Sequence, residues 1–132
     1  MSIRDVVTNE NLSCTDNDPN AVSIADGWEV LRKADKIIGH NVVQYDARVV
    51  IKLCIQNRIP LEKLVDTLIL ARLIWPEIKQ QDFILWRKGR MPGKLLGSHS
   101  LKAWGYRLGI LKGDYGEQED AWDRWTPSMQ SY

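Results

Sequence analysis

The fold is decided around residues 39–46, which read GHNVVQYD. Before this stretch, Lys36–Gly39 carries the pair Ile37-Ile38 and predicts a short buried strand. After it, Asp46–Asn57 has apolar residues at helical spacing and predicts a helix that Pro60 ends. A short strand that leads through a polar turn into a helix is typical of an α/β domain.

The flanking sequence continues this alternation of strands and helices, and 132 residues suggest one domain. Ser2–Thr8 is rich in β-branched residues and predicts a strand, and Ser23 with Asp26 predicts the capping box of a helix. The elements predicted downstream are a strand at Leu64-Val65, a helix from Asp66-Thr67 to Ile74, a looser region punctuated by Gly89, Pro92, Gly93 and Gly97, and a helix from Ser98 or Ser100 to Gly109.

Composition excludes several classes of protein. Apolar residues make up 44% of the chain and the net charge is +1, which is ordinary for a globular domain. The two cysteines, Cys14 and Cys54, indicate neither a disulfide framework nor a metal finger. The sequence has no signal peptide and no apolar run of membrane length. A cytosolic location with reduced thiols is therefore expected.

The charges are unevenly distributed along the second half of the chain. No Asp or Glu occurs from Phe83 to Gly113, whereas acidic residues dominate from Asp114 to Asp123. A basic stretch of this kind is either a phosphate-binding face or a solvated loop and helix, and charge alone does not separate the two. Its basic residues are Arg87, Lys88, Arg90, Lys94, Lys102, Arg107 and Lys112.

Asn41 and Asp46 also have two interpretations. A carboxylate that follows a strand is placed to hold a hard cation, and Mg²⁺ often uses one or two carboxylates together with a substrate phosphate. Alternatively, Asp46 favours the positive end of a helix and Asn41 caps a turn. These two residues by themselves do not decide between the readings.

Three stretches together resemble one known family. Asn41-x-x-x-Tyr45-Asp46 looks like the second motif of the proofreading exonucleases that have four acidic metal ligands. From about Ile3 to Tyr132 the chain is similar to the 3′→5′ proofreading exonuclease domain of DNA polymerases from short-tailed phages, which belong to polymerase family A. The other matching stretches are Asp66–Ile74 and Gly97–Gly109, the latter followed by Lys112-Gly113.

This resemblance implies a ribonuclease H-like fold, in which helices flank both faces of a mixed central sheet. The implied reaction is hydrolysis of the 3′-terminal nucleotide of single-stranded DNA with two divalent ions, Mg²⁺ or Mn²⁺. The implied partners are single-stranded DNA at the primer 3′ end and the remainder of a family A polymerase. The implied location is the cytoplasm of a phage-infected or prophage-bearing bacterium.

The sequence departs from the family in its catalytic residues. Family members use an Asp-x-Glu on the first strand, the Asp of the Asn-Tyr-Asp motif and a late Tyr-x-x-x-Asp. Asp46 matches the second of these as a metal ligand, and Tyr132 stands where the late, water-orienting Tyr would be. Asp5 is followed by Val7 instead of Glu, so we interpret Asp5 as a strand-end residue and not a ligand. We therefore expect residues 1–132 to be a partial exonuclease domain, truncated at both ends and with incomplete first strands.

Three expectations follow for function. One carboxylate does not hold two magnesium ions, so metal binding should be weak or absent and the chain should be inactive by itself. The alternative is a non-catalytic remnant that binds single-stranded DNA or a polymerase. Incomplete first strands also predict self-association through an exposed sheet edge.

The expected DNA contacts combine the motif with the basic stretch. Asn41 and Tyr45 are the substrate-binding residues that the motif implies, while Trp86 and Trp104 are candidates for base stacking, with core packing favoured for Trp104. Other polar residues have structural readings: Asp66-Thr67 as a helix cap, His40 in the turn, and His99 packing or capping beside Ser98 and Ser100. The basic residues expected to contact DNA, in an exposed and mobile loop, are Arg87, Lys88, Arg90 and Lys94.

Overall fold

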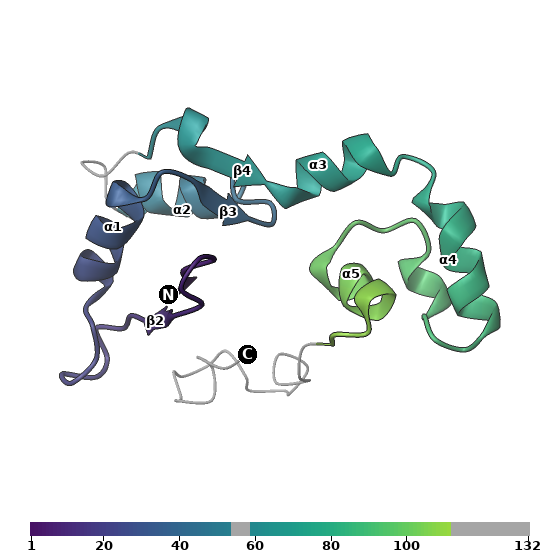
Figure 1. Cartoon of the computed structure of the whole chain (residues 1–132), viewed down its shortest axis with the longest axis horizontal. Coiled ribbons are helices and arrows are strands. Elements are labelled where there is room, and N and C mark those ends of the chain that lie inside the picture. The colour runs from purple at the N-terminus through teal and green to yellow at the C-terminus, as the bar shows by residue number, and fades with distance from the viewer. Residues whose placement is uncertain (54–58, 112–132) are drawn as a thin grey trace. The chain divides into compact units, whose positions relative to one another are not determined.

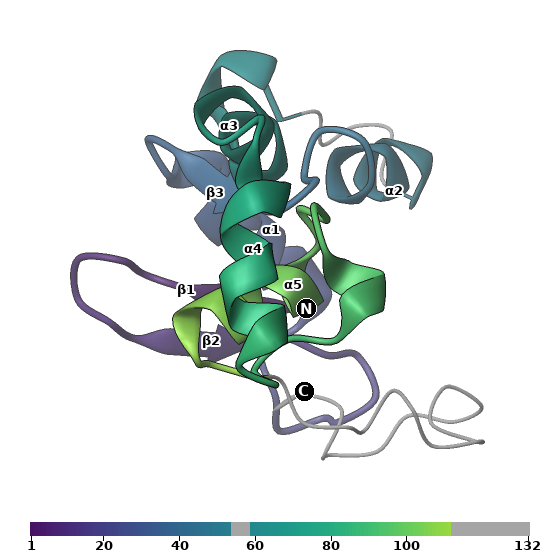
Figure 2. The same ribbon diagram turned by 90° about the vertical axis from the view of Figure 1, so that its right-hand side faces the viewer.

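The computed structural model describes residues 1–53 and 59–111, whose α-helices and strands are labelled in Figures 1 and 2. The described residues fall into two compact units, of which the first contains Met1–Asp35 and the second begins at Lys36. The prediction of an α/β fold is confirmed, because the described residues form five α-helices and two sheets of two strands. The single central sheet of a ribonuclease H-like fold remains a prediction.

A two-stranded antiparallel sheet opens the first unit, where β1 (Ser2–Arg4) pairs with β2 (Asn11–Ser13). Strand β1 is shorter than the strand predicted from the sequence, which extended to Thr8. It ends because the carboxylate of Asp5 accepts the backbone N–H groups of Val7 and Thr8, at 2.8 and 2.9 Å, and bends the chain into a turn. Asp5 is thus a strand-end residue, as expected.

Helix α1 (Ile24–Lys33) completes the described part of the first unit. Its predicted capping box is confirmed: Ser23 Oγ accepts the N–H of Asp26 at 3.1 Å and donates to the Asp26 carboxylate at 2.7 Å. The helix buries Trp28, and Gly27 lies so close to the buried Cys14 that an added Cβ would come within 2.5 Å of its Sγ. The core of this unit therefore forms where α1 meets the residue that follows β2.

A parallel pair of strands forms the centre of the second unit. Strand β3 (Ile37–Gly39) pairs with β4 (Leu64–Asp66), and Gly39 lies opposite Asp66. The prediction that β3 is a buried strand is wrong for one of its faces, because Ile38 is 55% exposed. A side chain on a two-stranded sheet is covered only where a helix packs over it.

Helices follow both strands. Helix α2 (Asp46–Leu53) begins after the turn that leaves β3, and its predicted continuation to Asn57 lies outside the described residues. The short 3₁₀ helix η1 (Leu61–Lys63) leads into β4, and α3 (Thr67–Ile74) begins directly after it. Helix α3 has the bounds that the sequence predicts and ends before Pro76, which does not continue a helix.

The region after Pro76 is not loose, as the sequence suggested, but contains helix α4 (Ile78–Arg87). This helix lacks a capping side chain, because the carboxylate of its N-cap residue, Glu77, accepts from the side chain of Gln80 and from no backbone N–H group of the helix. Its start therefore has none of the signals by which a helix is recognised in sequence. A further 3₁₀ helix, η2 (Gly93–Leu95), follows α4.

Helix α5 (Leu101–Leu108) has the predicted signals at both ends. Ser100 Oγ accepts the N–H of Ala103 at 3.3 Å, and Gly109 ends the helix in the left-handed conformation at φ 71°. Helices α4 and α5 lie side by side in Figures 1 and 2, joined by an ion pair described below. None of the helices in the described ranges is long and apolar enough to span a bilayer.

Candidate functional site

Residues 39–46 form a tight turn between β3 and α2. Asn41 adopts a left-handed backbone conformation at φ 65°, and its carbonyl accepts the N–H of Tyr45 at 3.0 Å. Val42 is buried beneath the turn, and a Cβ added at Gly39 would lie 2.7 Å from the Cβ of Val42. The close approach explains the glycine, and the positive φ suits asparagine better than most residues.

The carboxylate of Asp66 binds this turn from the neighbouring strand. It accepts the backbone N–H groups of Asn41 and Val43, at 3.0 and 3.1 Å, as well as those of Leu68 and Ile69 at the start of α3. Burial raises the pKa of Asp66, but the N–H groups outweigh it, so the pKa lies below its ordinary value of 3.8. The predicted helix cap is confirmed; the second contact, with the turn, was not foreseen.

Tyr45 and Asp46 lie on the exposed side of the turn. Tyr45 is 66% exposed, and Asp46 is exposed as the first residue of α2. Both follow the carboxyl end of β3, and open parallel sheets bind their ligands outside the carboxyl ends of the strands. Tyr132, the expected water-orienting residue, lies outside the described residues.

Thr67 and His40 hold the other side of the turn. The hydroxyl of Thr67 donates to the carbonyl of Gly39 at 3.2 Å and lies 3.0 Å from Nδ1 of His40. Because the hydroxyl proton is directed at Gly39, Nδ1 of His40 carries the proton of the second hydrogen bond. Nε2 of His40 is buried without a hydrogen-bond partner among the described residues. His40 therefore acts within the turn.

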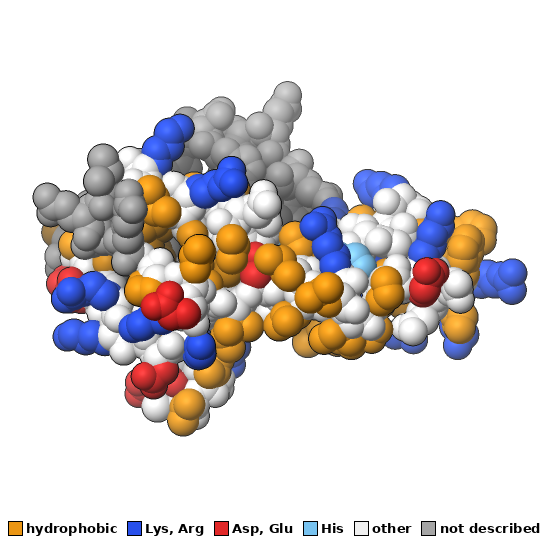
Figure 3. All heavy atoms as spheres, turned by 90° about the horizontal axis from the view of Figure 1, so that it is seen from above, with side chains coloured by type: hydrophobic (Ala, Val, Ile, Leu, Met, Phe, Trp, Pro, Cys, Tyr) orange, Lys and Arg blue, Asp and Glu red, His pale blue; other side chains and the backbone are white. Residues whose placement is uncertain are grey.

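The four basic residues predicted to meet DNA lie at the end of α4 and just after it. Arg87 is the last residue of α4, Lys88 follows it, and Lys94 is in η2. All of these and Arg90 are exposed, as expected. Figure 3 shows Lys and Arg side chains, in blue, around the end of the second unit that carries α4. Arg87 and Lys94 are held on helical turns, so the expected mobile loop is instead ordered secondary structure at these positions.

Arg107 belongs to a different environment from the other basic residues. Its guanidinium donates from Nε and Nη2 to the carboxylate of Asp82, at 2.8 and 2.7 Å, and Nη2 also donates to the carbonyl of Ser98 at 2.6 Å. The Asp82 and Arg107 side chains are 1% and 8% exposed. Counting Arg107 with a phosphate-binding stretch is therefore wrong, because its charge is already paired inside the protein.

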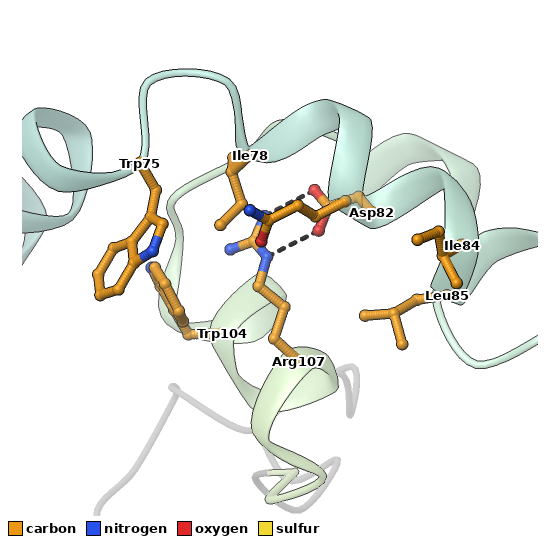
Figure 4. A pocket seen from close by; sticks show the side chains of 8 residues that line it. Trp75, Ile78, Asp82, Ile84, Leu85, Trp104 and Arg107 are labelled. Carbon is orange, nitrogen blue, oxygen red and sulfur yellow. Dashed lines mark hydrogen bonds and ion pairs between the residues drawn. The ribbon is translucent and has the colours of Figure 1, made fainter.

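The ion pair lines a cavity of about 330 Å³ between α4 and α5. Figure 4 shows Arg107 reaching from α5 to Asp82, with Trp75 and Trp104 on one side of the ion pair and Ile84 and Leu85 on the other. The two tryptophan rings are 5.1 Å apart, and the Arg107 guanidinium lies 4.8 Å from the centre of the Trp104 ring. Trp104 thus packs within the second unit, which agrees with the reading favoured from sequence.

The described residues provide little for a metal ion. Within residues 1–53 and 59–111, no group of three or more His, Cys, Asp or Glu side chains is arranged to hold one. Asp46 offers one exposed carboxylate, which suits a single hard cation that also contacts a phosphate. It does not suit a pair of ions.

The amino-acid sequence of the chain is similar to that of phage DNA polymerases. No protein-family model matches the chain. The DNA-directed DNA polymerase of Escherichia phage T7 is 44% identical over 118 residues, which cover 86% of this chain and 17% of the polymerase. That of Enterobacteria phage T3 is 46% identical over 90 residues, 64% of this chain and 13% of the polymerase. The chain is therefore homologous to a segment of phage DNA polymerases, and it spans less than a fifth of the length of these relatives.

Proposed function

We propose that residues 1–132 form part of the 3′→5′ proofreading exonuclease domain of a phage-type family A DNA polymerase. The observation that carries this proposal is the turn at residues 39–46, which presents Tyr45 and Asp46 to solvent beyond the carboxyl end of a parallel strand pair. The homology to a segment of phage DNA polymerases supports the polymerase part of this proposal. The substrate is the 3′ end of single-stranded DNA, and Asn41 and Tyr45 contact it.

Asp46 has the role of a metal ligand in this proposal. Bound Mg²⁺ or Mn²⁺ would supply Lewis-acid chemistry at the DNA phosphate. Because no group of three or more metal-ligating side chains occurs within residues 1–53 and 59–111, we expect the chain by itself to hold the metal weakly and not to hydrolyse DNA. Two-metal hydrolysis would need further carboxylates, for which we propose a second polymerase segment as the source.

We predict that the chain by itself has no 3′→5′ exonuclease activity. A labelled single-stranded oligonucleotide is incubated with nuclease-free preparations of the chain and of Asp46→Ala, in the presence of Mg²⁺ or Mn²⁺. We expect no stepwise shortening with either protein. Efficient shortening that disappears in Asp46→Ala would show that the chain is a complete nuclease and would overturn this prediction.

The second part of the proposal is a phosphate contact at the end of α4. Arg87, Lys88, Arg90 and Lys94 are exposed, and no ion pair involves them within the described ranges. Each phosphate that a basic residue neutralises releases a counterion, so binding of single-stranded DNA should weaken as salt rises. Loss of a contact reduces the slope of log affinity against log salt by about 0.7.

Fluorescence anisotropy with a short labelled oligonucleotide tests this contact. The variant Arg87→Gln/Lys88→Gln/Arg90→Gln should bind more weakly at low salt and with a smaller salt slope. The matched control, Arg4→Gln/Lys33→Gln/Lys52→Gln, removes the same charge from exposed positions elsewhere and should retain most of the slope. Equal binding by the parent and the first variant would refute the phosphate contact. Asp46→Asn should bind as well as the parent or slightly better, because it removes a negative charge.

The alternative function is a non-catalytic module that binds single-stranded DNA or another part of a polymerase. Of the two carboxylates at the turn, only that of Asp46 is exposed, which favours this alternative over independent catalysis. The catalytic and non-catalytic functions are distinguished by adding a second polymerase segment, produced independently, that carries the remaining carboxylates. Activity restored by the mixture, and lost with Asp46→Ala, would support a catalytic role, whereas binding without activity would support the alternative.

A further inference from the structure

The junction between β4 and α3 does more than begin a helix. A serine cap such as Ser100 satisfies α5 with one hydroxyl oxygen, which accepts one N–H. Asp66 has two oxygens and uses them differently: Oδ1 accepts from Leu68, Ile69 and Asn41, whereas Oδ2 accepts from Val43. Oδ1 thus caps α3 and also binds the turn at Asn41, while Oδ2, which the cap does not use, binds the turn alone.

The side chain is well placed to restrain the turn. Asp66 is 6% exposed, and charged acceptors make shorter and stronger hydrogen bonds to N–H groups than neutral ones do. The next residue, Thr67, binds the carbonyl of Gly39 and the ring of His40. Two consecutive residues therefore hold the turn: Asp66 binds two of its backbone N–H groups, and Thr67 binds the carbonyl of Gly39.

This restraint is transmitted to the exposed residues. The N–H of Tyr45 donates to Asn41, and that of Ala47 donates to Val42, at 3.0 and 2.8 Å. The start of α2 is thus hydrogen-bonded to the part of the turn that Asp66 holds. If Asn41 and Val43 moved away from Asp66, Tyr45 and Asp46 would therefore also lose their fixed positions.

We propose that Asp66 is a positioning residue for the DNA-binding turn: its carboxylate holds Asn41 and Val43 so that Tyr45 and Asp46 are already ordered before DNA arrives. This inference rests on the proposed function, because it assigns the ordered turn to DNA. A binding surface that is ordered in advance loses less conformational entropy when the ligand binds. Asp66 does not itself contact DNA.

Two substitutions separate positioning from capping. Asp66→Ser retains an oxygen for the N-cap of α3 but is too short to reach Asn41 and Val43. Amide hydrogen exchange should then accelerate severalfold at Asn41 and Val43, while Leu68 and Ile69 keep most of their protection. Asp66→Asn, which keeps one acceptor oxygen, should accelerate exchange mainly at Val43. Unchanged protection of Asn41 and Val43 in Asp66→Ser would refute the restraint.

The functional measurement is DNA affinity as a function of salt, with a labelled oligo-dT as the probe. Asp66→Ser should bind about fivefold more weakly at every salt concentration, because the turn must be ordered on binding. The slope should stay at the parent value, because the number of phosphate contacts is unchanged. Ser100→Ala, which removes the cap of α5 and leaves the turn intact, controls for lost stability and should bind like the parent.

Each result has a distinct meaning. Affinity equal to the parent in Asp66→Ser, or an equal loss in Ser100→Ala, would overturn the positioning role. A changed slope would mean that Asp66 acts through phosphate contacts and would also overturn it. If the parent does not bind oligo-dT at all, the proposed function and the DNA role of the turn fail together. The exchange data would then still decide whether Asp66 restrains the turn.

Discussion

At the scale of single residues, the ion pair between Asp82 and Arg107 is buried, with side chains that are 1% and 8% exposed. Burial raises the pKa of Asp82, but the Arg107 guanidinium and the N–H of Gly97 outweigh it, so the pKa lies below 3.8. Removing one partner leaves the other charge buried and unpaired. The pair joins α4 to α5 and orients the loop at Gly97 and Ser98.

We predict that Asp82→Ala and Arg107→Ala each lower the free energy of unfolding by about 3–5 kcal/mol. The double variant Asp82→Leu/Arg107→Met, with apolar side chains of similar size, should recover most of that loss. The free energies of unfolding of the parent and the three variants are measured by urea unfolding, followed by tryptophan fluorescence. If the single variants were as stable as the parent, the pair would contribute nothing to the second unit.

We expect His99 to make the stability of the protein depend on pH. Burial lowers the pKa of His99 below its ordinary 6.5, and the nearby charges of Arg107 and Arg72 lower it further. Its Nδ1 is buried without a hydrogen-bond partner among the described residues. The unfolded chain therefore binds a proton more readily than the folded one, and stability present above pH 6.5 is lost as the pH falls through the lowered pKa.

The variant His99→Gln removes this titration. Between about pH 7.5 and about pH 5.5, it should lose less unfolding free energy than the parent does. Urea unfolding at several pH values gives the comparison, and His40→Gln serves as a control for a histidine at another site. If the parent and His99→Gln lost equal amounts of unfolding free energy over this pH range, another group would cause the pH dependence. Below pH 3.8, protonation of Asp66 and Asp82 should destabilise parent and variant alike.

At the scale of secondary structure, Gly105 shows how packing overrides helix propensity. It lies within α5, where alanine is normally preferred by about 1 kcal/mol. A Cβ at this position would lie 2.7 Å from the carbonyl oxygen of Ile110, whose N–H binds the carbonyl of Gly105 at 2.9 Å. The chain thus folds back against the helix where only glycine leaves room.

We therefore predict that Gly105→Ala lowers the free energy of unfolding by about 1 kcal/mol or more, in spite of its better helix propensity. The control is Gly109→Asn at the C-cap of the same helix, which places a residue that tolerates positive φ at an open position. It should have a much smaller effect. Thermal unfolding compares the stability of the two variants. If Gly105→Ala were more stable than the parent, the backbone at Ile110 would be able to move aside without loss of stability.

At the scale of the whole molecule, the second unit exposes a large apolar surface over α3. The exposed side chains include Leu73 at 73% and Ile74 at 59%, and Figure 3 shows hydrophobic side chains, in orange, along this helix. Exposed apolar surface of this extent favours association. We predict that the chain self-associates as its concentration rises.

Sedimentation velocity over a concentration series measures this association. Leu73→Lys/Ile74→Lys should shift the equilibrium toward the monomer. Val6→Lys/Val7→Lys, which adds the same charge at exposed positions of the first unit, should shift it much less. A parent that stays monomeric at high concentration would contradict the prediction, and equal effects of both variants would point to net charge instead of α3.

The sequence by itself determined those elements whose signals are local. Ser23, Asp66 and Ser100 cap helices because each reaches an N–H group two or three residues away, and Gly109 ends α5 through its own φ. The exposure of the basic residues at the end of α4 also followed from their charge. Helix α4 was missed because its start has no capping side chain.

Tertiary structure alone decided which distant groups meet. The parallel register that places Gly39 opposite Asp66 brings a helix cap to a turn 25 residues away. The packing of α4 against α5 likewise pairs Asp82 with Arg107 and removes one charge from the basic stretch. A spacing pattern along the chain does not contain these pairings, because they depend on how strands and helices lie against one another in space.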